Sequence, residues 1–422
     1  MSGTIRPPGD KSITHRTLIL ASLARSTSRI AGALTSADAK STARVLRQLG
    51  CEVGPLEIDR VLEVRGTSWS EPASVLNCGN SGTTARLMLG ALAGHHFSAR
   101  ITGDASLRRR PMRRVTDPLV AMGATVSEQG SDGLPLVIRG GNLRSIVYET
   151  PVASAQVKSA ILLAGLVGGV PVTVVEPARS RDHTERLLQF LGCDLRVRGT
   201  EVSLVGAPEG WPRVGDLDLA VPGDASSSAF LVGAALLAGK GELLIAGVGV
   251  NPTRIGYLAV LQRMGGRIEL LDPREVAGEP VADLLVRPQP LIGTEVVAGE
   301  IPSLIDEIPL LAVLAARASG ETTFRSVGEL RVKESDRLAL IAQNLRTVGA
   351  TAEVQGENLV VVGSDRPLRG LVDTAGDHRL TMSFAVLGTA IGCDIELSEV
   401  ESAGISYPRF FADLRQAAGN AQ

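Results

Sequence analysis

The chain has 422 residues, of which 44% are hydrophobic, 3% are aromatic and 47 are glycine. This length exceeds one ordinary domain and predicts two or three, and a composition rich in small aliphatic residues is typical of alternating helices and strands. The formal net charge of -2 excludes a globally basic chain, so we expect neither nucleic acid nor a membrane surface as a partner.

Cysteine usage and hydropathy argue against disulfides, metal clusters and membrane spans. None of the four cysteines forms a CxxC pair, so we predict small buried residues at Cys51, Cys78, Cys193 and Cys393. The longest apolar run, residues 161–175, is interrupted by glycines and by Pro171, and it is too short to cross a bilayer. The first residues show no secretory signal, and we expect a cytoplasmic protein.

Two interleaved series of helices recur along the chain. Helices of the first series are rich in Ala, Leu and Gly and should be buried on all sides; they span His15–Ala24, Ser81–Ala93, Ala155–Val167, Ser226–Ala238, Glu307–Ala318 and Arg379–Ile391. Helices of the second series are amphipathic and stop at a glycine, a common C-terminal cap, at Gly50, Gly123, Gly192, Gly265, Gly349 and Gly419. Because this pattern recurs, we predict six copies of one unit of about 70 residues.

A Pro-Gly-Asp sequence occurs twice, at Pro8–Asp10 and at Pro222–Asp224. Three repeated units fall between the two copies and three follow the second copy. We therefore predict that the chain passes between two domains at both places, and that the two crossings form a double hinge. The first strand, Gly3–Arg6, precedes the first copy and should join the second half. The longest interval contains Asp272–Ala282, which we interpret as a turn-rich surface insertion.

The starts of these helices are polar and carry many cations. Asp10, Ser81 and Asp224 can serve as ordinary N-caps, but a cap requires neither lysine nor arginine. If the repeated units point their helices the same way, the starts meet on one face of each domain. Two such faces opposed across a hinge form a cleft that favours anions. The cations at the helix starts are Lys11, Arg16, Arg86, Arg110, Arg181, Lys333, Arg337 and Arg379.

Several other interpretations of the polar residues are disfavoured. The segment Arg108–Arg114 holds five arginines, but no aromatic residues interleave with them, as a nucleic-acid site would favour. The histidines show no spacing typical of metal ligands, and we interpret His183 and His378 as structural or hydrogen-bonding residues. No nucleophile elbow, Walker sequence or dinucleotide-binding sequence stands in its proper context.

Two segments, Leu76–Leu87 and Arg331–Leu338, resemble the signature sequences of the 5-enolpyruvylshikimate-3-phosphate (EPSP) synthase family. The similarity spans nearly the whole chain and includes Gly9–Ser12, Ser154–Lys158, Arg181–Glu185 and Asp377–Arg379. It implies an α/β protein with the two-domain enolpyruvyl-transferase fold. In that fold each domain has three repeated βαβαββ units with pseudo-threefold symmetry, and a double hinge joins the domains. The expected limits are 1–9 with 223–422, mainly for phosphoenolpyruvate, and 10–222, mainly for shikimate 3-phosphate.

The family transfers the enolpyruvyl group of phosphoenolpyruvate to the 5-hydroxyl of shikimate 3-phosphate, in the shikimate pathway of aromatic amino-acid biosynthesis. The reaction is an addition and elimination through a tetrahedral ketal phosphate, and the resemblance implies no metal or organic cofactor. It implies Asp306 as the base near the hydroxyl and Glu334 as the acid and base at the methylene carbon, while Lys11 shares in the proton transfers. We expect a monomer.

The resemblance also implies which residues bind each substrate. Phosphoenolpyruvate would contact Lys11, Asn80, Gly82, Arg110, Gln156, Arg337 and Arg379. Shikimate 3-phosphate would contact Lys11, Ser12, Arg16, Ser154, Ala155, Gln156, Arg181, Asp306 and Lys333. The segments Ser154–Lys158 and Arg181–Glu185 look like those of a bacterial subgroup with variable sensitivity to glyphosate, and Gly82 leaves room for that inhibitor.

Three features bear on rival assignments. Many family members carry a lysine before a Thr/Ser-Phe-Pro sequence near the C-terminus, whereas this chain has Ile405–Pro408 there, so one phosphoenolpyruvate contact is missing or replaced. A UDP-N-acetylglucosamine enolpyruvyl transferase shares the fold but usually has a cysteine in the loop at Asp104–Met112, where this chain has none. A non-catalytic anion-binding scaffold would not place acids such as Asp306 and Glu334 among its cations.

Overall fold

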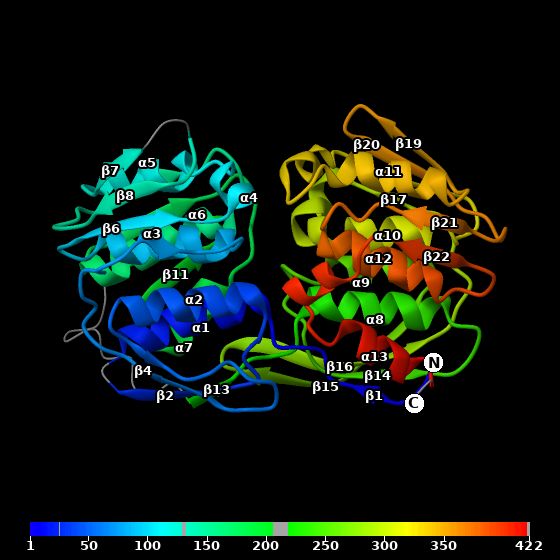
Figure 1. Cartoon of the computed structure of the whole chain (residues 1–422), viewed down its shortest axis with the longest axis horizontal. Coiled ribbons are helices and arrows are strands. Elements are labelled where there is room, and N and C mark those ends of the chain that lie inside the picture. Colours follow the sequence, from blue (N-terminus) through cyan, green and yellow to red (C-terminus); the bar gives the residue numbers. More distant parts are fainter. Residues whose placement is uncertain (25, 129–131, 206–217, 420–422) are drawn as a thin grey trace. The chain divides into compact units, whose positions relative to one another are not determined.

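The computed structural model describes residues 1–24, 26–128, 132–205 and 218–419 (Figure 1). The chain divides into two compact units. Unit 1 comprises Met1–Pro8, Pro222–Glu275 and Pro280–Gln422, and unit 2 comprises Gly9–Val221 and Val276–Glu279. Both main crossings between the units lie one residue before the predicted limits, and the short segment Val276–Glu279 is a further crossing that the sequence did not suggest.

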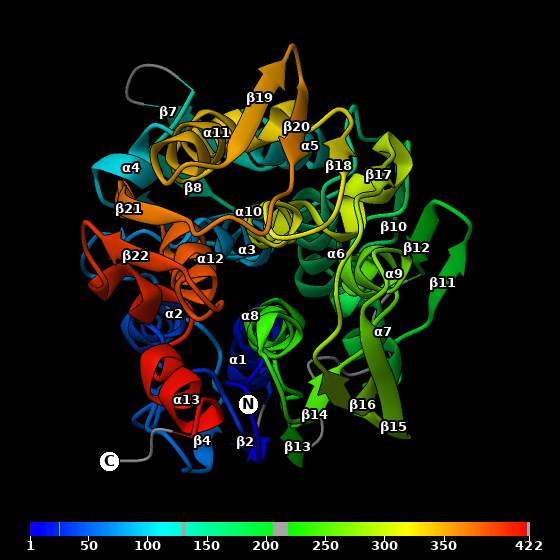
Figure 2. The same ribbon diagram turned by 90° about the vertical axis from the view of Figure 1, so that its right-hand side faces the viewer.

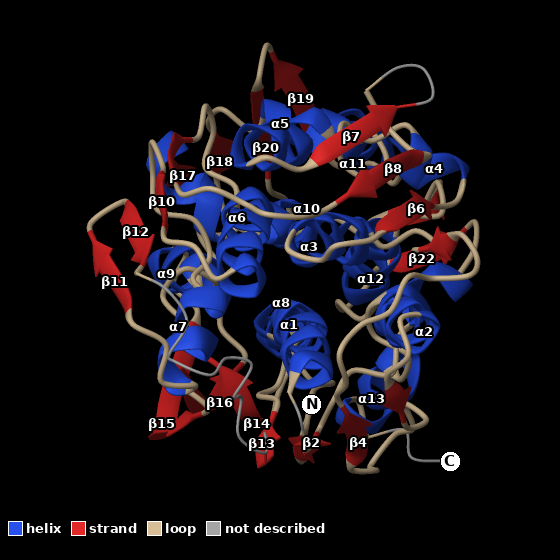
Figure 3. Cartoon of the chain, turned by 90° about the vertical axis from the view of Figure 1, so that its left-hand side faces the viewer, coloured by secondary structure: helices blue, strands red, loops and turns tan. Residues whose placement is uncertain are grey.

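Helices of the first series lie at the centre of each unit, as Figure 2 shows for unit 1 and Figure 3 for unit 2. They are α1 (Lys11–Leu23), α3 (Gly82–Ala93) and α6 (Ala155–Gly168) in unit 2, and α8 (Ala225–Leu237), α10 (Ile308–Ala315) and α12 (His378–Gly388) in unit 1. Every residue of α10 is buried, which confirms the predicted all-round burial for that helix. Close packing needs small residues: a Cβ on Gly90 of α3 would lie 2.5 Å from the Cα of Ala160 in α6.

Helices of the second series lie outside the central ones and end at the predicted glycines. They are α2 (Ala37–Gln48), α5 (Arg113–Met122), α7 (His183–Phe190), α9 (Gly256–Arg263), α11 (Arg337–Thr347) and α13 (Phe410–Ala417). All six glycines adopt a positive φ, between 78° and 115°, which side chains other than glycine rarely tolerate. The predicted C-terminal caps are therefore confirmed. The remaining short helices are α4 (Ala105–Arg108), η1 (Ala298–Ser303), η2 (Ile305–Glu307), η3 (Gly328–Val332) and η4 (Glu401–Ile405).

Small sheets cover the helices; each begins with a parallel pair of strands, and those with four strands are mixed. Unit 2 contains β13 (Asp218–Ala220), β2 (Thr27–Ala31), β4 (Leu62–Arg65) and β3 (Glu52–Val53); β5 (Leu76–Asn77), β6 (Ser98–Thr102), β8 (Leu136–Arg139) and β7 (Thr125–Glu128); and β9 (Ile146–Glu149), β10 (Val172–Val175), β12 (Glu201–Leu204) and β11 (Leu195–Arg198). Within each set the strands are given in spatial order, and the third strand runs antiparallel to the second.

Unit 1 follows the same scheme with one shorter sheet. Its sheets are β1 (Thr4–Ile5), β14 (Leu243–Gly249), β16 (Glu279–Arg287) and β15 (Arg267–Val276); β17 (Glu295–Val296), β18 (Glu321–Phe324), β20 (Asn358–Val362) and β19 (Thr351–Gln355); and β21 (Arg369–Val372) with β22 (Asp394–Leu397). The first strand of the chain, β1, pairs with β14, in the second half of the sequence. Each unit also has its own hydrophobic core. The mixed α/β class predicted from the sequence is confirmed.

The prediction of a turn-rich insertion at Asp272–Ala282 is wrong. These residues belong to the hairpin of β15 and β16, whose connection is only Ala277 and Gly278. Both connecting residues have positive φ, 53° and 79°, as a tight hairpin turn requires. Pro273 suggested a loop, but β15 is the last strand of its sheet, where a proline is tolerated because the strand has a free edge.

Close backbone approaches explain the glycines at the two main crossings. A Cβ on Gly9 would lie 1.9 Å from the carbonyl oxygen of Gly32, and a Cβ on Gly223 would lie 2.6 Å from Cγ of Pro7. A backbone hydrogen bond also joins the two crossing segments within unit 1, where the N–H of Asp224 donates to the carbonyl of Pro8 at 2.8 Å. Glycine is required at both positions because any side chain would collide with the neighbouring chain.

Cysteines and possible metal ligands offer no further site in the part of the chain described here. Cys51, Cys78 and Cys193 are buried as predicted, Cys393 is half-buried, and all four are free thiols. No group of three or more His, Cys, Asp or Glu residues within the described ranges is placed to hold a metal ion. Among the same residues, no helix has the length and apolarity needed to cross a membrane.

Candidate active site

In unit 2, capping side chains open the helices that carry the predicted cations. Asp10 Oδ1 accepts a hydrogen bond from the backbone N–H three residues later at 2.8 Å, and Ser81 and Ser154 do the same at 3.1 and 3.5 Å. All three are therefore ordinary N-caps. Capping does not explain the cationic and amide side chains that follow them.

Arg16 of α1 joins the starts of three helices of unit 2. Its Nε donates to Thr184 Oγ1 at 2.7 Å, its Nη1 donates to the carbonyl of Ser12 at 2.9 Å, and its Nη2 donates to Ser159 Oγ at 2.8 Å. Burial lowers the pKa of Arg16 to about 10, so the guanidinium stays charged at neutral pH. Since Ser159 belongs to α6 and Thr184 to α7, this cation connects both helices to α1.

A second group in unit 2 surrounds the start of α3. Arg110 Nη2 donates to Asn80 Oδ1 at 2.8 Å, and Arg86 Nη1 donates to Gln156 Oε1 at 2.7 Å. A Cβ on Gly82 would lie 3.0 Å from Arg86 Nη1 and 3.2 Å from Arg110 Nη1. The absence of a side chain at residue 82 thus lets two guanidinium groups approach the first turn of α3.

The other predicted residues of unit 2 lie in the first turn of a helix or just before it. Lys11 Nζ is 3.4 Å from Asp38 Oδ2, and the Lys11 side chain is partly exposed. Ser12 follows Lys11 in α1, Ala155 is the first residue of α6, and Arg181 stands immediately before Asp182, the N-cap position of α7. Unit 2 therefore holds ten of the fifteen predicted site residues.

A buried chain of hydroxyl groups connects the starts of α1, α2 and α3. His15 Nδ1 lies 2.7 Å from Thr42 Oγ1, which lies 2.7 Å from Thr84 Oγ1, and that hydroxyl donates to Ser81 Oγ at 2.7 Å. Burial, helped by the positive charges of Lys11 and Arg16, lowers the pKa of the fully buried His15 from 6.5 to about 3. His15 is therefore neutral in the folded protein across the physiological range.

The depressed pKa of His15 predicts a loss of stability in mild acid. Below pH 6.5 the unfolded chain binds a proton at His15 that the folded chain excludes, so the free energy of unfolding falls as the pH falls from 6.5 towards 3. Between pH 8 and pH 4.5 His15 should lower the free energy of unfolding by about 2–3 kcal/mol. Urea unfolding at several pH values measures the loss, and His15→Asn should reduce the slope. An identical pH dependence in both proteins would contradict a buried neutral histidine.

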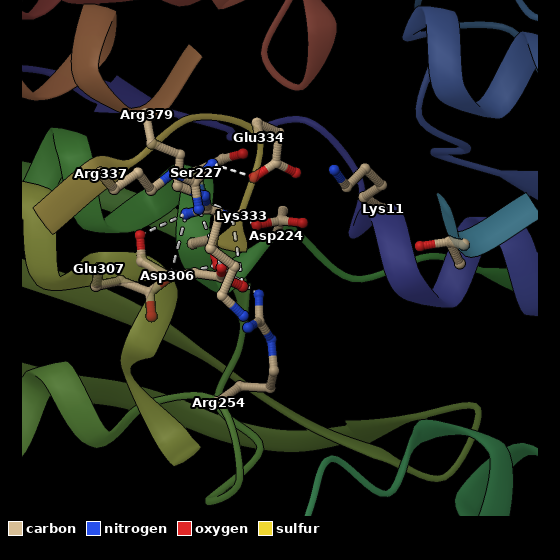
Figure 4. A network of polar contacts seen from close by, with 12 residues as sticks. Lys11, Asp224, Ser227, Arg254, Asp306, Glu307, Lys333, Glu334, Arg337 and Arg379 are labelled. Atoms are coloured by element: carbon tan, nitrogen blue, oxygen red, sulfur yellow. Dashed lines mark hydrogen bonds and ion pairs between the residues drawn. The ribbon is translucent and has the colours of Figure 1, made fainter. Parts of the chain in front are cut away.

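In unit 1, two acids and two arginines form one network (Figure 4). Arg337 Nη2 lies 2.7 Å from Glu334 Oε2, and Arg337 Nη1 lies 3.6 Å from Asp306 Oδ1. Arg379 Nη2 lies 3.8 Å from the other carboxylate oxygen of Asp306. Burial opposes the charge of Arg337, yet the carboxylates of Glu334, Asp377 and Asp306 raise its pKa above the usual value. The cation is permanently charged and both acids are held beside it.

Asp377 organises this network, although the sequence indicated no role for it beyond its place in the family segment Asp377–Arg379. Its Oδ2 accepts hydrogen bonds from Arg337 Nε at 2.8 Å and Ser335 Oγ at 2.9 Å, and its Oδ1 accepts from the backbone N–H of Arg379 at 2.9 Å. Burial opposes ionisation, but Arg337 and His378 keep the pKa of Asp377 below its usual value. Asp377 is also the N-cap of α12, and this position, together with the family segment, was the signal in the sequence.

Two further positions singled out from the sequence, Lys333 and Ile405, also belong to unit 1. Lys333 Nζ donates to Glu329 Oε1 at 2.8 Å, and the residue lies between η3 and α11. Ile405 ends η4 and stands where many family members have a lysine. The nearby Tyr407 hydroxyl donates to Asp413 Oδ2 at 2.8 Å, so this segment contributes a buried hydrogen bond instead of a cation.

Comparisons with known proteins agree with the sequence resemblance. A family model described as EPSP synthase (3-phosphoshikimate 1-carboxyvinyltransferase) matches residues 1–414. A 3-phosphoshikimate 1-carboxyvinyltransferase of Synechococcus sp. (strain RCC307) is 46% identical, with 98% of this chain and 96% of that protein covered. One of Geobacter metallireducens is 44% identical, with 99% and 96% covered.

Solved structures show the same similarity. The structure of EPSP synthase from Acinetobacter baumannii matches with a TM-score of 0.87 and 35% identity, covering 98% of this chain and 95% of that one. The enolpyruvyl transferase NikO from Streptomyces tendae matches with a TM-score of 0.78 over 99% of this chain and 95% of that one. Because the two sequences are only 20% identical, this match shows a similar fold and nothing more.

Proposed function

Since the chain belongs to the EPSP synthase family, we propose that it transfers the enolpyruvyl group of phosphoenolpyruvate to the 5-hydroxyl of shikimate 3-phosphate and releases phosphate. One observation in unit 1 supports this most directly. Asp306 and Glu334, the acids proposed for the two proton transfers, both lie within ion-pair distance of the buried Arg337. Acids beside fixed cations suit a reaction that moves protons on anionic substrates.

The addition step uses both acids. Asp306 accepts the proton of the 5-hydroxyl while the hydroxyl oxygen bonds to C2 of phosphoenolpyruvate. Glu334 delivers a proton to the methylene carbon. The product is the tetrahedral ketal phosphate. In the elimination step the C–O bond to phosphate breaks, the phosphate leaves with the proton that Asp306 had accepted, and a methyl proton returns to Glu334, so the double bond forms again. Lys11 stabilises the negative charge of phosphoenolpyruvate and shares in the proton transfers. The reaction needs no metal and no organic cofactor.

The two substrates divide between the residues as follows in this proposal. Shikimate 3-phosphate contacts the starts of α1, α6 and α7 through Lys11, Ser12, Arg16, Ser154, Ala155, Gln156 and Arg181, together with Asp306 and Lys333. The phosphate and carboxylate of phosphoenolpyruvate contact Lys11, Asn80, Gly82, Arg110, Gln156, Arg337 and Arg379. Bidentate guanidinium groups and helix starts are suited to both anions. We further propose that the enzyme works as a cytoplasmic monomer.

A phosphate-release assay tests the proposed reaction. Purified protein is incubated with phosphoenolpyruvate and either shikimate 3-phosphate or UDP-N-acetylglucosamine. We expect release only with shikimate 3-phosphate. Phosphate release only with the UDP-sugar would identify the chain as a UDP-N-acetylglucosamine enolpyruvyl transferase. No release with either acceptor would favour a non-catalytic anion-binding scaffold.

A further inference from the structure

Three ionisable side chains of unit 2 form a buried cluster that the proposed reaction does not use. Lys158 Nζ lies 2.6 Å from Glu176 Oε2 and 2.8 Å from Glu185 Oε1. The side chains are only 1% to 3% exposed. Removing three charges from water is costly unless geometry and further hydrogen bonds compensate. Stability alone therefore does not explain why these three side chains are buried together.

Glu176 connects the cluster to two segments proposed to bind shikimate 3-phosphate. Its Oε1 accepts a hydrogen bond from the backbone N–H of Ser154 at 3.1 Å. Its Oε2, the atom that also faces Lys158, accepts from the backbone N–H of Ser180 at 3.3 Å. Ser154 opens α6, and Ser180 immediately precedes Arg181. One buried carboxylate thus fixes the backbone at both segments.

Glu185 connects the same cluster to Arg16. Glu185 and Thr184 are neighbours in α7, and Thr184 Oγ1 accepts a hydrogen bond from Arg16 Nε at 2.7 Å. The negative charge of Glu185 acts on Arg16 and favours its charged form. Lys158 is thus paired with both Glu176 and Glu185, and Glu185 also favours the charge of Arg16. The cluster supports the third segment that we assign to shikimate 3-phosphate.

We infer that Lys158, Glu176 and Glu185 are positioning residues for shikimate 3-phosphate, holding Ser154, Arg181 and Arg16 in the arrangement that receives it. This inference rests on the proposed function. None of the three is among the residues proposed to contact the substrate. Their contribution is to keep the backbone of two segments and one guanidinium group fixed before the substrate arrives, which lowers the cost of ordering them on binding.

The substitution Glu176→Gln tests the inference. An amide in place of the carboxylate must present its NH₂ group either to the N–H of Ser154 or to the donors of Ser180 and Lys158, so one contact becomes repulsive. We expect the Kd and KM for shikimate 3-phosphate to rise about tenfold, the effect of losing one charge-assisted hydrogen bond. With shikimate 3-phosphate saturating, kcat and the KM for phosphoenolpyruvate should change less than about threefold. Calorimetric titration with shikimate 3-phosphate alone gives the Kd independently of turnover.

Control variants separate positioning from general weakening of the fold. Leu136→Ala removes a fully buried side chain of β8 in unit 2, so it should lower the Tm without changing the Kd for shikimate 3-phosphate. Glu176→Asp keeps the charge but withdraws the carboxylate by one methylene. If the amide variant does not fold, the aspartate variant replaces it in the test, and its Kd should lie between that of the parent protein and the roughly tenfold higher value predicted for Glu176→Gln.

Two outcomes have distinct meanings. Folded Glu176 variants with the Kd of the parent protein would overturn the positioning role while leaving the proposed function intact. A parent protein that neither binds nor turns over shikimate 3-phosphate would overturn the proposed function itself.

Discussion

Replacing Asp306 by asparagine should lower kcat by about 10³-fold, within the range for loss of a positioned acid or base. The amide has nearly the same shape but cannot accept the hydroxyl proton. The neighbouring cations should stay in place, because Arg337 is still bound by Asp377 and Glu334, and Arg379 Nη1 still donates to Glu307 Oε1 at 3.3 Å. Steady-state rates of phosphate release measure the effect.

A matched surface variant makes the Asp306 result interpretable. Asp365→Asn makes the same chemical change at an exposed position of unit 1, and its kcat should equal that of the parent protein. If Asp306→Asn also retained kcat within about threefold, Asp306 would not be the base, and the proton of the hydroxyl would have to pass to another group.

Replacing Lys11 by methionine should lower kcat/KM by about 10²-fold or more, since a fixed charge and a proton-transfer group are lost together. Methionine keeps an unbranched chain in the first turn of α1. Lys11 Nζ lies 3.4 Å from Asp38 Oδ2 in a partly exposed ion pair, and exposed pairs add little stability. The fold should therefore persist, and circular dichroism together with steady-state kinetics can check both expectations.

The control for Lys11 is another of the five lysines in the chain. Lys40 lies exposed on α2 of the same unit, so Lys40→Met should leave turnover unchanged. Near-normal turnover in Lys11→Met would show that Lys11 takes no part in the reaction.

Much of the fold could be predicted because its signals are local and repeated. A glycine such as Gly50 or Gly265 adopts a positive φ at the end of an amphipathic helix, and this requirement recurs at every copy. The error at Asp272–Ala282 has a physical reason. A proline and several charged residues predict turns, but an edge strand tolerates both, and the true turn is Ala277-Gly278, without the Asn-Gly or Asp-Gly that signals a tight hairpin.

The buried partners of the candidate site could not be predicted in the same way. Asp377 occupies a capping position, and a cap explains an aspartate fully until the fold brings Arg337, 40 residues away, against it. Glu176 lies 18 residues from Lys158 and 22 from Ser154. Such contacts depend on how the chain packs, within one repeat for Glu176 and between two repeats for Asp377 and Arg337, and no local pattern encodes them. The roles assigned to Asp306, Glu334 and the substrate-binding residues remain predictions.

The central claim is that this chain joins the enolpyruvyl group to the 5-hydroxyl of shikimate 3-phosphate. The most direct measurement is carbon NMR of the reaction products with phosphoenolpyruvate labelled at C2. We predict that the label appears in a vinyl ether whose oxygen is attached to C5 of the shikimate ring, with an equal amount of phosphate released. Label that stays in phosphoenolpyruvate, passes to pyruvate or joins a UDP-sugar would contradict it.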